Sequence, residues 1–243
     1  MNNMIKFSII TINYNNSSGL LRTIESVVNQ DCSCFEYIII DGGSTDGSVD
    51  VIKQYADKID YWISESDNGI YNAMNKGIDK CNGEWCLFLN SGDFFSNSNI
   101  ISIINEYNIS ENVGVIYGDW YDYSKEGLLY RTPNPFFEMN TYLHHKGICH
   151  QSSFTRMDLA KELHFDESFK IAADYKLFYD IYSKGYEFKY LPIPISCFEI
   201  GVGVSQRNPR IAFKEDAIIL KRYGTIRYWY YYFKKFIYPK FKL

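Results

Sequence analysis

The sequence has little of what marks several large classes of protein. None of its apolar runs reaches the roughly 18 residues that a membrane-spanning helix requires. The chain also starts without the basic segment and apolar stretch of a secretory leader, because residues 1–6 lead directly into a short strand-like run. Low-complexity linkers and internal repeats are absent as well. We therefore expect a cytoplasmic protein with its own hydrophobic core and no membrane span.

The six cysteines are not arranged in CxxC pairs, the spacing that is typical of zinc sites and redox motifs. They are also scattered across a mid-sized chain that carries no recognisable secretory signal. The sequence therefore predicts free thiols in a reducing compartment and no structural zinc. The cysteines are Cys32, Cys34, Cys81, Cys86, Cys149 and Cys197.

The composition is that of a globular protein whose charge is unevenly distributed. Hydrophobic residues make up 46% of the chain and charged residues 22%, which suits a sizeable core. A length of 243 residues fits one large domain with a modest appendage better than two equal domains. Although the formal net charge is −4, residues 217–243 hold seven basic and no acidic side chains. The body of the protein is therefore acidic and its C-terminal tail basic.

Short apolar runs alternate with segments of helical periodicity in the first part of the chain. Leu20, Ile24 and Val27 recur with the helical period after the first run, and Ser17 or Ser18 stands where a helix cap is expected. Strands that alternate with helices form a mostly parallel sheet with helices on both faces. The expected strands are residues 6–12, 35–40, 61–64 and 85–89, and a later helix is expected over residues 172–184.

Polar residues follow each of these four strands. In sheets of this kind, ligands bind beyond the carboxyl ends of the strands. The sequence therefore predicts one binding crevice, formed by four loops. The loops are residues 13–16, 41–46, 65–68 and 90–93.

Four blocks of sequence stand in the order of a known family. They are TINYN at residues 11–15, DGGSTDGS at 41–48, ESDNGIYNAMNKGI at 65–78, and HQ at 150–151 together with ADY at 173–175. In this order they resemble the family 2 glycosyltransferases with the GT-A fold, and the resemblance covers about the first 200 residues.

The resemblance implies an α/β fold with a Rossmann-like, mostly parallel sheet, helices on both faces, an irregular acceptor-side region and a helical tail. Residues 1–220 would form the GT-A domain, divided into a nucleotide-sugar-binding half (1–119) and an acceptor-side half (120–220). Residues 221–243 would form the tail.

The activity that the resemblance implies is transfer of a sugar from a nucleotide donor, expected to be a UDP-sugar, to a glycan hydroxyl with inversion. Such a donor presents a base, a ribose and a diphosphate, so its site needs an aromatic face, hydrogen-bond acceptors and a cation. Tyr14 and Asp41 supply the first two types. We expect donor contacts from Thr11, Asn13, Tyr14, Asp41, Asp67, Lys76, Asn90 and Ser91.

Asp93 is the expected ligand of a divalent cation, Mg²⁺ or Mn²⁺, shared with the donor phosphates. It lies on a tight turn, where Gly92 would let the backbone approach a ligand closely. An aspartate beside a glycine can instead serve only to hold its own turn. His150 is a second candidate for the metal or for phosphate, and a structural histidine is the alternative.

The chain departs from the usual family pattern at two acids. Gly92 stands where the first of two acids after the fourth strand is usual, and Gly42 stands where a carboxylate usually reads the uracil N–H. We hypothesise that Glu65 and Asp67 take over that reading, although both could be surface acids. Lys76 is the nearest cation where many relatives carry an arginine, and it could serve the diphosphate as a point charge or be a solvated helix lysine.

Asp174 matches the catalytic aspartate of the family. A sugar hydroxyl is a poor nucleophile until a base takes its proton, and the start of a helix favours the ionised carboxylate that a base requires. The alternative is an acid that only stabilises the helix. Residues 201–207, with two glycines and Arg207, could close over the ligands or form an ordinary turn.

Aromatic residues interleave with lysine and arginine from residue 221 onward. This pattern is typical of segments that lie on an anionic membrane surface, and such contact at the inner face of the cell membrane would suit a lipid-linked glycan acceptor of surface polysaccharide assembly. The alternative is a helix that packs on the domain or on a second subunit of a homo-oligomer. The acidic remainder of the chain argues against nucleic acid as a partner.

A second function stays open because Gly42 and Gly92 stand where the family usually carries acidic residues. The chain could be a non-catalytic nucleotide-sugar-binding or partner subunit on the same fold. A dinucleotide-dependent oxidoreductase is excluded, since no GxGxxG follows the first strand.

Overall fold

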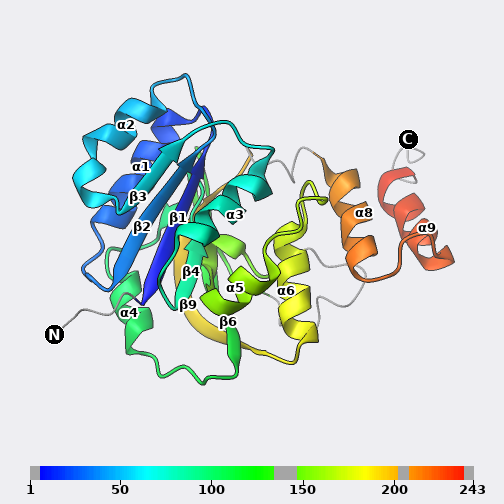
Figure 1. The fold of residues 1–243 in the computed structure, drawn as a ribbon. Helices are drawn as coiled ribbons and strands as arrows, with labels where there is room; N and C mark the ends of the chain where they lie inside the picture. Colours follow the sequence, from blue (N-terminus) through cyan, green and yellow to red (C-terminus); the bar gives the residue numbers. More distant parts are fainter. Residues whose placement is uncertain (1–5, 134–146, 202–207, 238–243) are drawn as a thin grey trace.

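The computed structural model of the chain describes residues 6–133, 147–201 and 208–237. Its first half contains four parallel strands whose connections carry helices (Figure 1). All four match the predicted runs closely. The elements are β1 (Phe7–Asn13), α1 (Ser17–Val28), β2 (Phe35–Asp41), α2 (Ser48–Gln54), the 3-10 helix η1 (Ala56–Lys58), β3 (Tyr61–Ser64), α3 (Ile70–Lys80) and β4 (Trp85–Phe88).

The second half adds strands that run in both directions. In it, β8 is antiparallel to β4 and β6, whereas β9 is parallel to β6 and antiparallel to β5. The elements are β5 (Phe94–Phe95), α4 (Ile100–Glu106), β6 (Val113–Ser124), β7 (Gly127–Arg131), the 3-10 helix η3 (His150–Ser152), β8 (Ser153–Arg156), α5 (Met157–Leu163), α6 (Ala173–Ser183), β9 (Glu187–Glu199), α8 (Pro209–Ile219), α9 (Ile226–Tyr232) and the π-helix η4 (Phe233–Ile237).

Within the described residues the strands form a nine-stranded sheet in the order β3-β2-β1-β4-β8-β6-β9-β5, with β7 paired to β6. Helices cover both of its faces, as the sequence predicts (Figure 1). Phe7 and Ile9 of β1 pack with buried side chains of α1, α2 and α4, whereas Ile10 and Ile12 pack with those of α3, α5 and α6. Gly77 lets α3 approach β1 closely, because a Cβ atom there would lie 2.6 Å from Cγ2 of Ile10. Because successive side chains of β1 point to opposite faces of the sheet, the sheet divides the core into two layers.

The cap of the first helix lies one residue before the two serines expected there. The side chain of Asn16, not that of Ser17 or Ser18, accepts a hydrogen bond from the backbone N of Gly19 at 3.2 Å. Nδ2 of Asn16 also donates to the carbonyl of Ser91 at 3.0 Å. The cap of α1 is therefore tied to the loop that follows β4, a contact that the sequence does not reveal.

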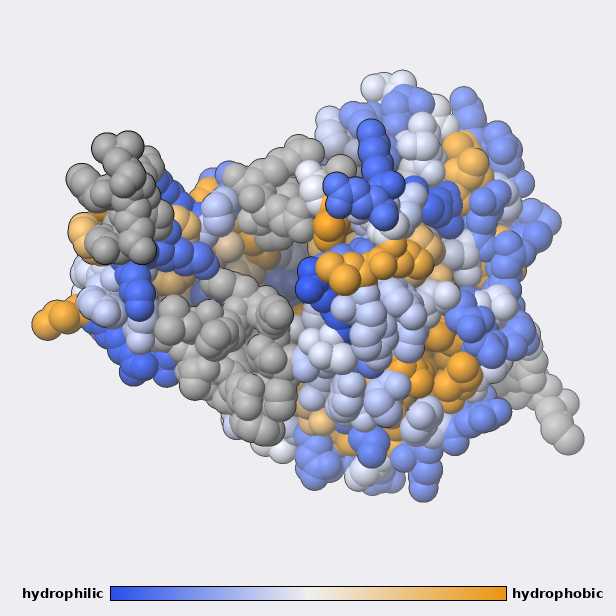
Figure 2. Space-filling view, turned by 180° about the vertical axis from the view of Figure 1, so that it is seen from behind, coloured by the Kyte–Doolittle hydropathy of each residue, from blue (hydrophilic) through white to orange (hydrophobic). Residues whose placement is uncertain are grey.

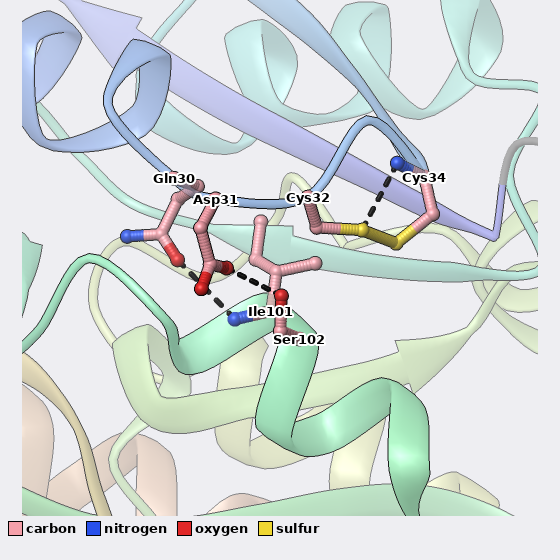
Figure 3. The surroundings of a disulfide bond; sticks show 6 residues. All are labelled: Gln30, Asp31, Cys32, Cys34, Ile101 and Ser102. Atoms are coloured by element: carbon pink, nitrogen blue, oxygen red, sulfur yellow. Dashed lines mark hydrogen bonds between the residues drawn. A yellow bond between two sulfur atoms is a disulfide. The ribbon is translucent and has the colours of Figure 1, made fainter.

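The prediction of six free thiols is wrong at one place. Cys32 and Cys34 form a disulfide in the connection between α1 and β2, with their Cα atoms 5.5 Å apart, a usual separation for such a bond (Figure 3). Only one residue separates them, a spacing that a search for CxxC pairs overlooks. The neighbouring side chains of Gln30 and Asp31 accept hydrogen bonds from Ile101 and Ser102 of α4 (Figure 3).

The disulfide lies at the amino end of β2, whereas the predicted crevice lies at the carboxyl ends of the strands. The remaining cysteines are free, as predicted, and all but one are buried. They are Cys81, Cys86, Cys149 and Cys197.

The last two helices form a unit at one end of the molecule, beyond α6 (Figure 1). Phe213 of α8 stacks on Tyr228 of α9 at 5.5 Å between ring centroids, and both rings are buried. Other side chains of α9 face solvent, among them Ile226 (91% exposed) and Trp229 (54%). Figure 2 shows hydrophobic and hydrophilic residues interleaved on this unit. None of the helices in the described residues has the length and apolar character needed to cross a membrane.

The predicted domain boundary at residue 220 falls between these two packed helices and stays a prediction. Residues 202–207 and 238–243 lie outside the described residues, so the closing loop proposed for 201–207 and the end of the tail are not described.

Candidate functional site

The carboxyl ends of β3, β2, β1 and β4 lie side by side, so their loops share one edge of the sheet. Asn13 and Asp41 are direct partners in the β1–β2 register, and Nδ2 of Asn13 donates to Oδ1 of Asp41 at 2.7 Å. The loop after β4 joins them through the backbone N of Ser91, which donates to the carbonyl of Ile12 at 3.1 Å. The structure thus brings the predicted loops together.

Asp41 is buried at the centre of this edge. It accepts hydrogen bonds from the hydroxyls of Ser44 and Ser64, both at 2.6 Å, and from the backbone N of Ser44 at 2.9 Å. Burial by itself would raise the pKa of Asp41, but these hydrogen bonds and that of Asn13 outweigh it, so the pKa is lowered. Asp41 is therefore an ionised anchor for three loops.

The amide of Asn13 is only half satisfied. Its Nδ2 group is engaged with Asp41 and Ser44, but its Oδ1 atom is buried and has no hydrogen-bond partner in the described part of the chain. Buried polar atoms are rarely left unpaired in proteins. Oδ1 of Asn13 is thus a buried acceptor whose partner is not found among the described residues.

Tyr14 and Thr11 differ in what they can offer a ligand. The Tyr14 ring is 70% exposed, as a stacking surface requires. Thr11 is fully buried, and its hydroxyl is hydrogen-bonded to the carbonyl of Leu89 at 2.8 Å and to the Tyr37 hydroxyl at 2.9 Å. The structure therefore leaves Tyr14 exposed at the carboxyl end of β1 and buries the Thr11 side chain against a face of the sheet.

Lys76 lies between two acids of the same block. Its Nζ atom is 2.7 Å from Oε1 of Glu65 and 2.7 Å from Oδ1 of Asp67, and the hydrogen bonds with Asp67 and then Glu65 raise the pKa of Lys76. Asp67 is the more buried acid. Its Oδ2 atom would lie 3.1 Å from a Cβ atom at Gly42, so a carboxylate stands beside the position where the family's acid is absent.

His150 connects two predicted site residues. Nδ1 of His150 lies 3.1 Å from Oδ2 of Asp174, and its Nε2 atom lies 3.3 Å from Nδ2 of Asn90. Since Nδ2 of Asn90 is a donor, the ring accepts at Nε2 and donates from Nδ1 to the carboxylate. Asp174 is in the first turn of α6, and its Oδ1 atom accepts from the backbone N of Tyr175 at 2.8 Å. Asn90, His150 and Asp174 are thus linked by a continuous series of hydrogen bonds, called here the chain Asn90–His150–Asp174.

Asp93 lies next to this chain and is buried. Its Oδ2 atom accepts from Nε2 of Gln151 at 3.1 Å, and its Oδ1 atom accepts from the backbone N of Glu199 at 2.9 Å. Burial raises the pKa of Asp93 to about 7, against the opposing effect of these hydrogen bonds. A neighbouring positive charge would favour the ionised form.

The residues present fit a cation only in part. Within residues 6–133, 147–201 and 208–237, no group of three or more histidine, cysteine or acidic side chains gathers to hold a metal ion. Asp93 is a hard oxygen ligand of the kind that Mg²⁺ and Mn²⁺ prefer, and such ions commonly take other ligands from phosphate and water. Both ring nitrogens of His150 are directed at Asp174 and Asn90. Its predicted role as a metal ligand would require the ring to leave one of them.

Sequence reasoning missed several residues that build this site. Ser44 follows Asp41 in the DGGS block, so a turn in which a serine bonds the preceding aspartate could have been anticipated. Arg22 and Glu199 form an ion pair at 3.1 Å beside the loop after β4. Nothing in the sequence connects these two residues.

Comparisons with known proteins agree on one family. The model of the family described as glycosyl transferase family 2 matches residues 8–173. A PGL/p-HBAD biosynthesis glycosyltransferase of Mycobacterium bovis is 30% identical over 164 residues, which cover 63% of this chain and 60% of that protein. An uncharacterized glycosyltransferase of Mycobacterium tuberculosis is 35% identical over 171 residues, which cover 69% of this chain and 65% of that protein. The chain thus spans less than two thirds of either relative.

Solved structures share the fold at lower identity. Residues 1–349 of TarS from S. aureus, in complex with UDP-GlcNAc, match 88% of this chain and 65% of that one with a TM-score of 0.69 and 19% identity. The mannosyltransferase PcManGT from Pyrobaculum calidifontis, in complex with GDP-Man and Mn²⁺, matches 88% of this chain and 64% of that one with a TM-score of 0.66 and 16% identity. The predicted GT-A fold is confirmed by this likeness.

Proposed function

The chain belongs to glycosyl transferase family 2, and on that basis we propose that this glycosyltransferase is inverting and metal-dependent and moves a sugar from a UDP-type donor to a glycan hydroxyl. The observation that carries the proposal is the chain Asn90–His150–Asp174 next to Asp93, at the edge of the sheet where the nucleotide loops meet. A base and a buried acid are thus available on one crevice.

The part of the proposal that concerns the donor rests on the loops after β1, β2 and β3. The exposed Tyr14 ring offers a stacking surface for a base, and the unpaired Oδ1 of Asn13 offers an acceptor. Asp67 stands beside Gly42 and can accept the N–H of a uracil in place of the missing acid. Structural neighbours bind UDP-GlcNAc in one case and GDP-Man in another, so the choice of uridine rests on these residues and not on the neighbours.

The part of the proposal that concerns catalysis rests on Asp174. We propose that Oδ2 of Asp174 takes the proton of the acceptor hydroxyl. The oxygen of that hydroxyl then attacks the anomeric carbon of the donor sugar as the bond from this carbon to the nucleoside diphosphate breaks. His150 donates to Oδ2 of Asp174 and so fixes the orientation of the carboxylate. A single displacement of this kind inverts the anomeric centre. A divalent cation, with Asp93 among its ligands, would supply charge neutralisation at the diphosphate.

The part of the proposal that concerns the acceptor rests on the C-terminal helices. Exposed hydrophobic and aromatic side chains of α9 and η4, among them Ile226, Trp229, Tyr230 and Phe233, share this unit with Lys234 and Lys235. This composition favours contact with anionic lipid and therefore a lipid-linked glycan as acceptor. Sedimentation with phosphatidylglycerol vesicles, but not with phosphatidylcholine vesicles, is the expected result. Equal sedimentation with both would contradict it.

The experiment that tests the function is calorimetric titration of the purified protein with UDP, GDP, dTDP and CMP, each with Mn²⁺ and with EDTA. We expect binding of UDP in Mn²⁺ and much weaker binding in EDTA. A panel of UDP-sugars then identifies the sugar by release of UDP. Nucleotide binding with no turnover of any sugar donor would favour the second function, a non-catalytic binding or partner subunit.

A further inference from the structure

The turn after β4 carries no side chain at residue 92, yet the space beside it is filled. Gly92 has a φ of +109°, a conformation that residues with a side chain rarely adopt. A Cβ atom built on Gly92 would overlap Oε2 of Glu199, the last residue of β9. A carboxylate therefore stands beside this turn, although it comes from the other half of the chain.

Two sets of contacts hold that carboxylate in place. The backbone N of Glu199 donates to Oδ1 of Asp93 at 2.9 Å, because β9 ends alongside β5. Oε1 of Glu199 pairs with Nη2 of Arg22 at 3.1 Å. The Arg22 guanidinium also donates to the carbonyl of Gly92 at 2.9 and 3.1 Å and lies 4.9 Å from the centroid of the Tyr123 ring. The position of Glu199 is thus fixed before any ligand arrives.

The second oxygen of Glu199 is available to a ligand. Oε2 has no hydrogen-bond partner within the described parts of the chain, and the side chain is 26% exposed. Nδ2 of Asn16 lies 3.5 Å from the Cβ position at Gly92, so this oxygen lies close to the loop after β1 as well. Oε2 therefore stands between the loops after β1 and β4.

The charge of Arg22 decides which ligand group suits this oxygen. A guanidinium paired with Oε1 offsets the negative charge of Glu199 and would repel a divalent cation placed against the same carboxylate. A hydroxyl group is neutral and needs only an acceptor with open geometry. The donor molecule offers such groups on its ribose.

We propose that Glu199 is a donor-binding residue whose Oε2 atom accepts a hydrogen bond from a ribose hydroxyl of the nucleotide, with Arg22 as its positioning residue. The inference rests on the proposed function and deepens it. Glu199 then supplies from β9 the carboxylate that Gly92 lacks, just as Asp67 lies beside Gly42.

The test compares nucleotide binding by the wild-type protein, Glu199→Gln and the control Glu187→Gln. In Glu199→Gln the new amide would keep its carbonyl oxygen toward Arg22 and so present an NH₂ group, a donor, in place of Oε2. We expect UDP affinity in Mn²⁺ to fall ~10-fold or more, as for the loss of a hydrogen bond to a charged group, while the affinity for inorganic diphosphate in Mn²⁺ is unchanged. Glu187 is at the other end of β9, where its exposed side chain accepts a hydrogen bond from Asn112, and its variant should bind UDP normally.

A second measurement starts from the wild-type protein, so its first result does not depend on folding of a variant. The wild-type protein should bind either 2′-deoxy-UDP or 3′-deoxy-UDP ~10-fold more weakly than UDP, and Glu199→Gln should not discriminate against that same analogue. Equal binding of UDP and both analogues by the wild type would overturn the proposal. So would an equal loss of UDP and diphosphate affinity in Glu199→Gln, since Glu199 would then act on the cation or the phosphates. Failure of the wild type to bind any nucleotide would overturn the proposed function itself, whereas failure of the inference appears only in the variant and the analogues.

Discussion

Replacement of Asp174 by asparagine separates a catalytic base from a residue that only stabilises a helix. The substitution keeps the shape of the side chain and keeps Oδ1 as the acceptor for the backbone N of Tyr175, now 2.8 Å away. It replaces Oδ2, which His150 contacts at 3.1 Å, by an NH₂ group that cannot take a proton. Any large effect on turnover therefore reports the lost base.

The surroundings can adapt to this change with little loss of stability. His150 can move its proton to Nε2 and accept at Nδ1 from the new amide. Nε2 would then donate toward Asn90, whose Oδ1 atom is buried and has no partner among the described residues, so that an amide flip completes the chain. What remains is the loss of a negative charge in the first turn of α6, which costs about 0.3–1 kcal/mol. The variant should therefore fold.

The effect on turnover should be much larger. A positioned base contributes ~10²–10⁴-fold to a proton transfer, which corresponds to about 3–5 kcal/mol of transition-state stabilisation. The assay is release of nucleoside diphosphate from the sugar donor selected by the binding screen, with calorimetric donor binding measured in parallel. We expect kcat to fall ~100-fold or more while the Kd of the donor stays within about threefold.

Asp158 provides a matched control. It is in the first turn of α5, and its Oδ1 atom accepts from the backbone N of the next residue, Leu159, at 2.8 Å, as Asp174 does from Tyr175, while both of its oxygens also pair with Arg156. Asp158→Asn should lose the same helix-terminal charge and leave kcat unchanged. A near-normal kcat in Asp174→Asn, or an equal loss in both variants, would refute the assignment of Asp174 as the base.

Four further substitutions test acidic side chains at this edge of the sheet. Asp93→Asn should bring the affinity for UDP in Mn²⁺ down to the value measured in EDTA, because the buried carboxylate is the expected protein ligand of the cation; calorimetry in both buffers measures this. Asp67→Asn should weaken UDP binding ~10-fold, whereas Glu65→Gln should not, since both acids pair with Lys76 but only Asp67 lies beside Gly42. Asp41→Asn should lower the free energy of unfolding at pH 7 by about 1–3 kcal/mol. Since folding lowers the pKa of Asp41, its contribution is present above the unfolded value of about 4 and is lost as the pH falls through the folded value, so urea unfolding of the two proteins should converge in acid.

Each of these expectations has a clear contrary result. Retained Mn²⁺ dependence in Asp93→Asn would point to another ligand, with His150 first in line. Equal effects at Asp67 and Glu65 would mean that the two acids serve only to hold Lys76. A stability difference at Asp41 that does not change with pH would mean that the carboxylate contributes through shape and not through charge.

The parallel half of the fold could be predicted because its information is local. β1, β2 and β4 are apolar runs buried on both faces, β3 is a half-buried run, and each strand ends at a polar loop, so the sequence predicts β1 to β4 with nearly the observed bounds. The placement of loops at one edge followed from the parallel direction alone. Even the hypothesis that Asp67 compensates for Gly42 was accessible, since β2 and β3 are neighbours in the chain as well as in the sheet.

Other features escaped because they depend on contacts between distant segments. Thr11 belongs to the TINYN block, which predicts a donor contact, but the pleat of β1 turns its side chain to a covered face of the sheet, where its hydroxyl bonds to Tyr37 and Leu89. Asn16 was passed over as a cap in favour of the serines that follow it, although its contact with Ser91 makes it the better placed residue. The Cys32–Cys34 bond joins cysteines with a single residue between them, a spacing that differs from the CxxC pattern.

The position of Asp174 shows most clearly why tertiary structure decides the site. The segment that leads into α6 has no capping side chain of its own. Instead, Glu215 of α8 accepts hydrogen bonds from the backbone N atoms of residues 170, 171 and 172 at 2.8–2.9 Å, and the Tyr71 hydroxyl accepts from Ala173 at 3.2 Å. One support comes from the NGIYNAMNKG block and the other from a helix near the end of the chain. The motif around Asp174 identifies a chemical group, but its orientation depends on residues about 40 positions after it and 100 before it, which no local pattern could have connected.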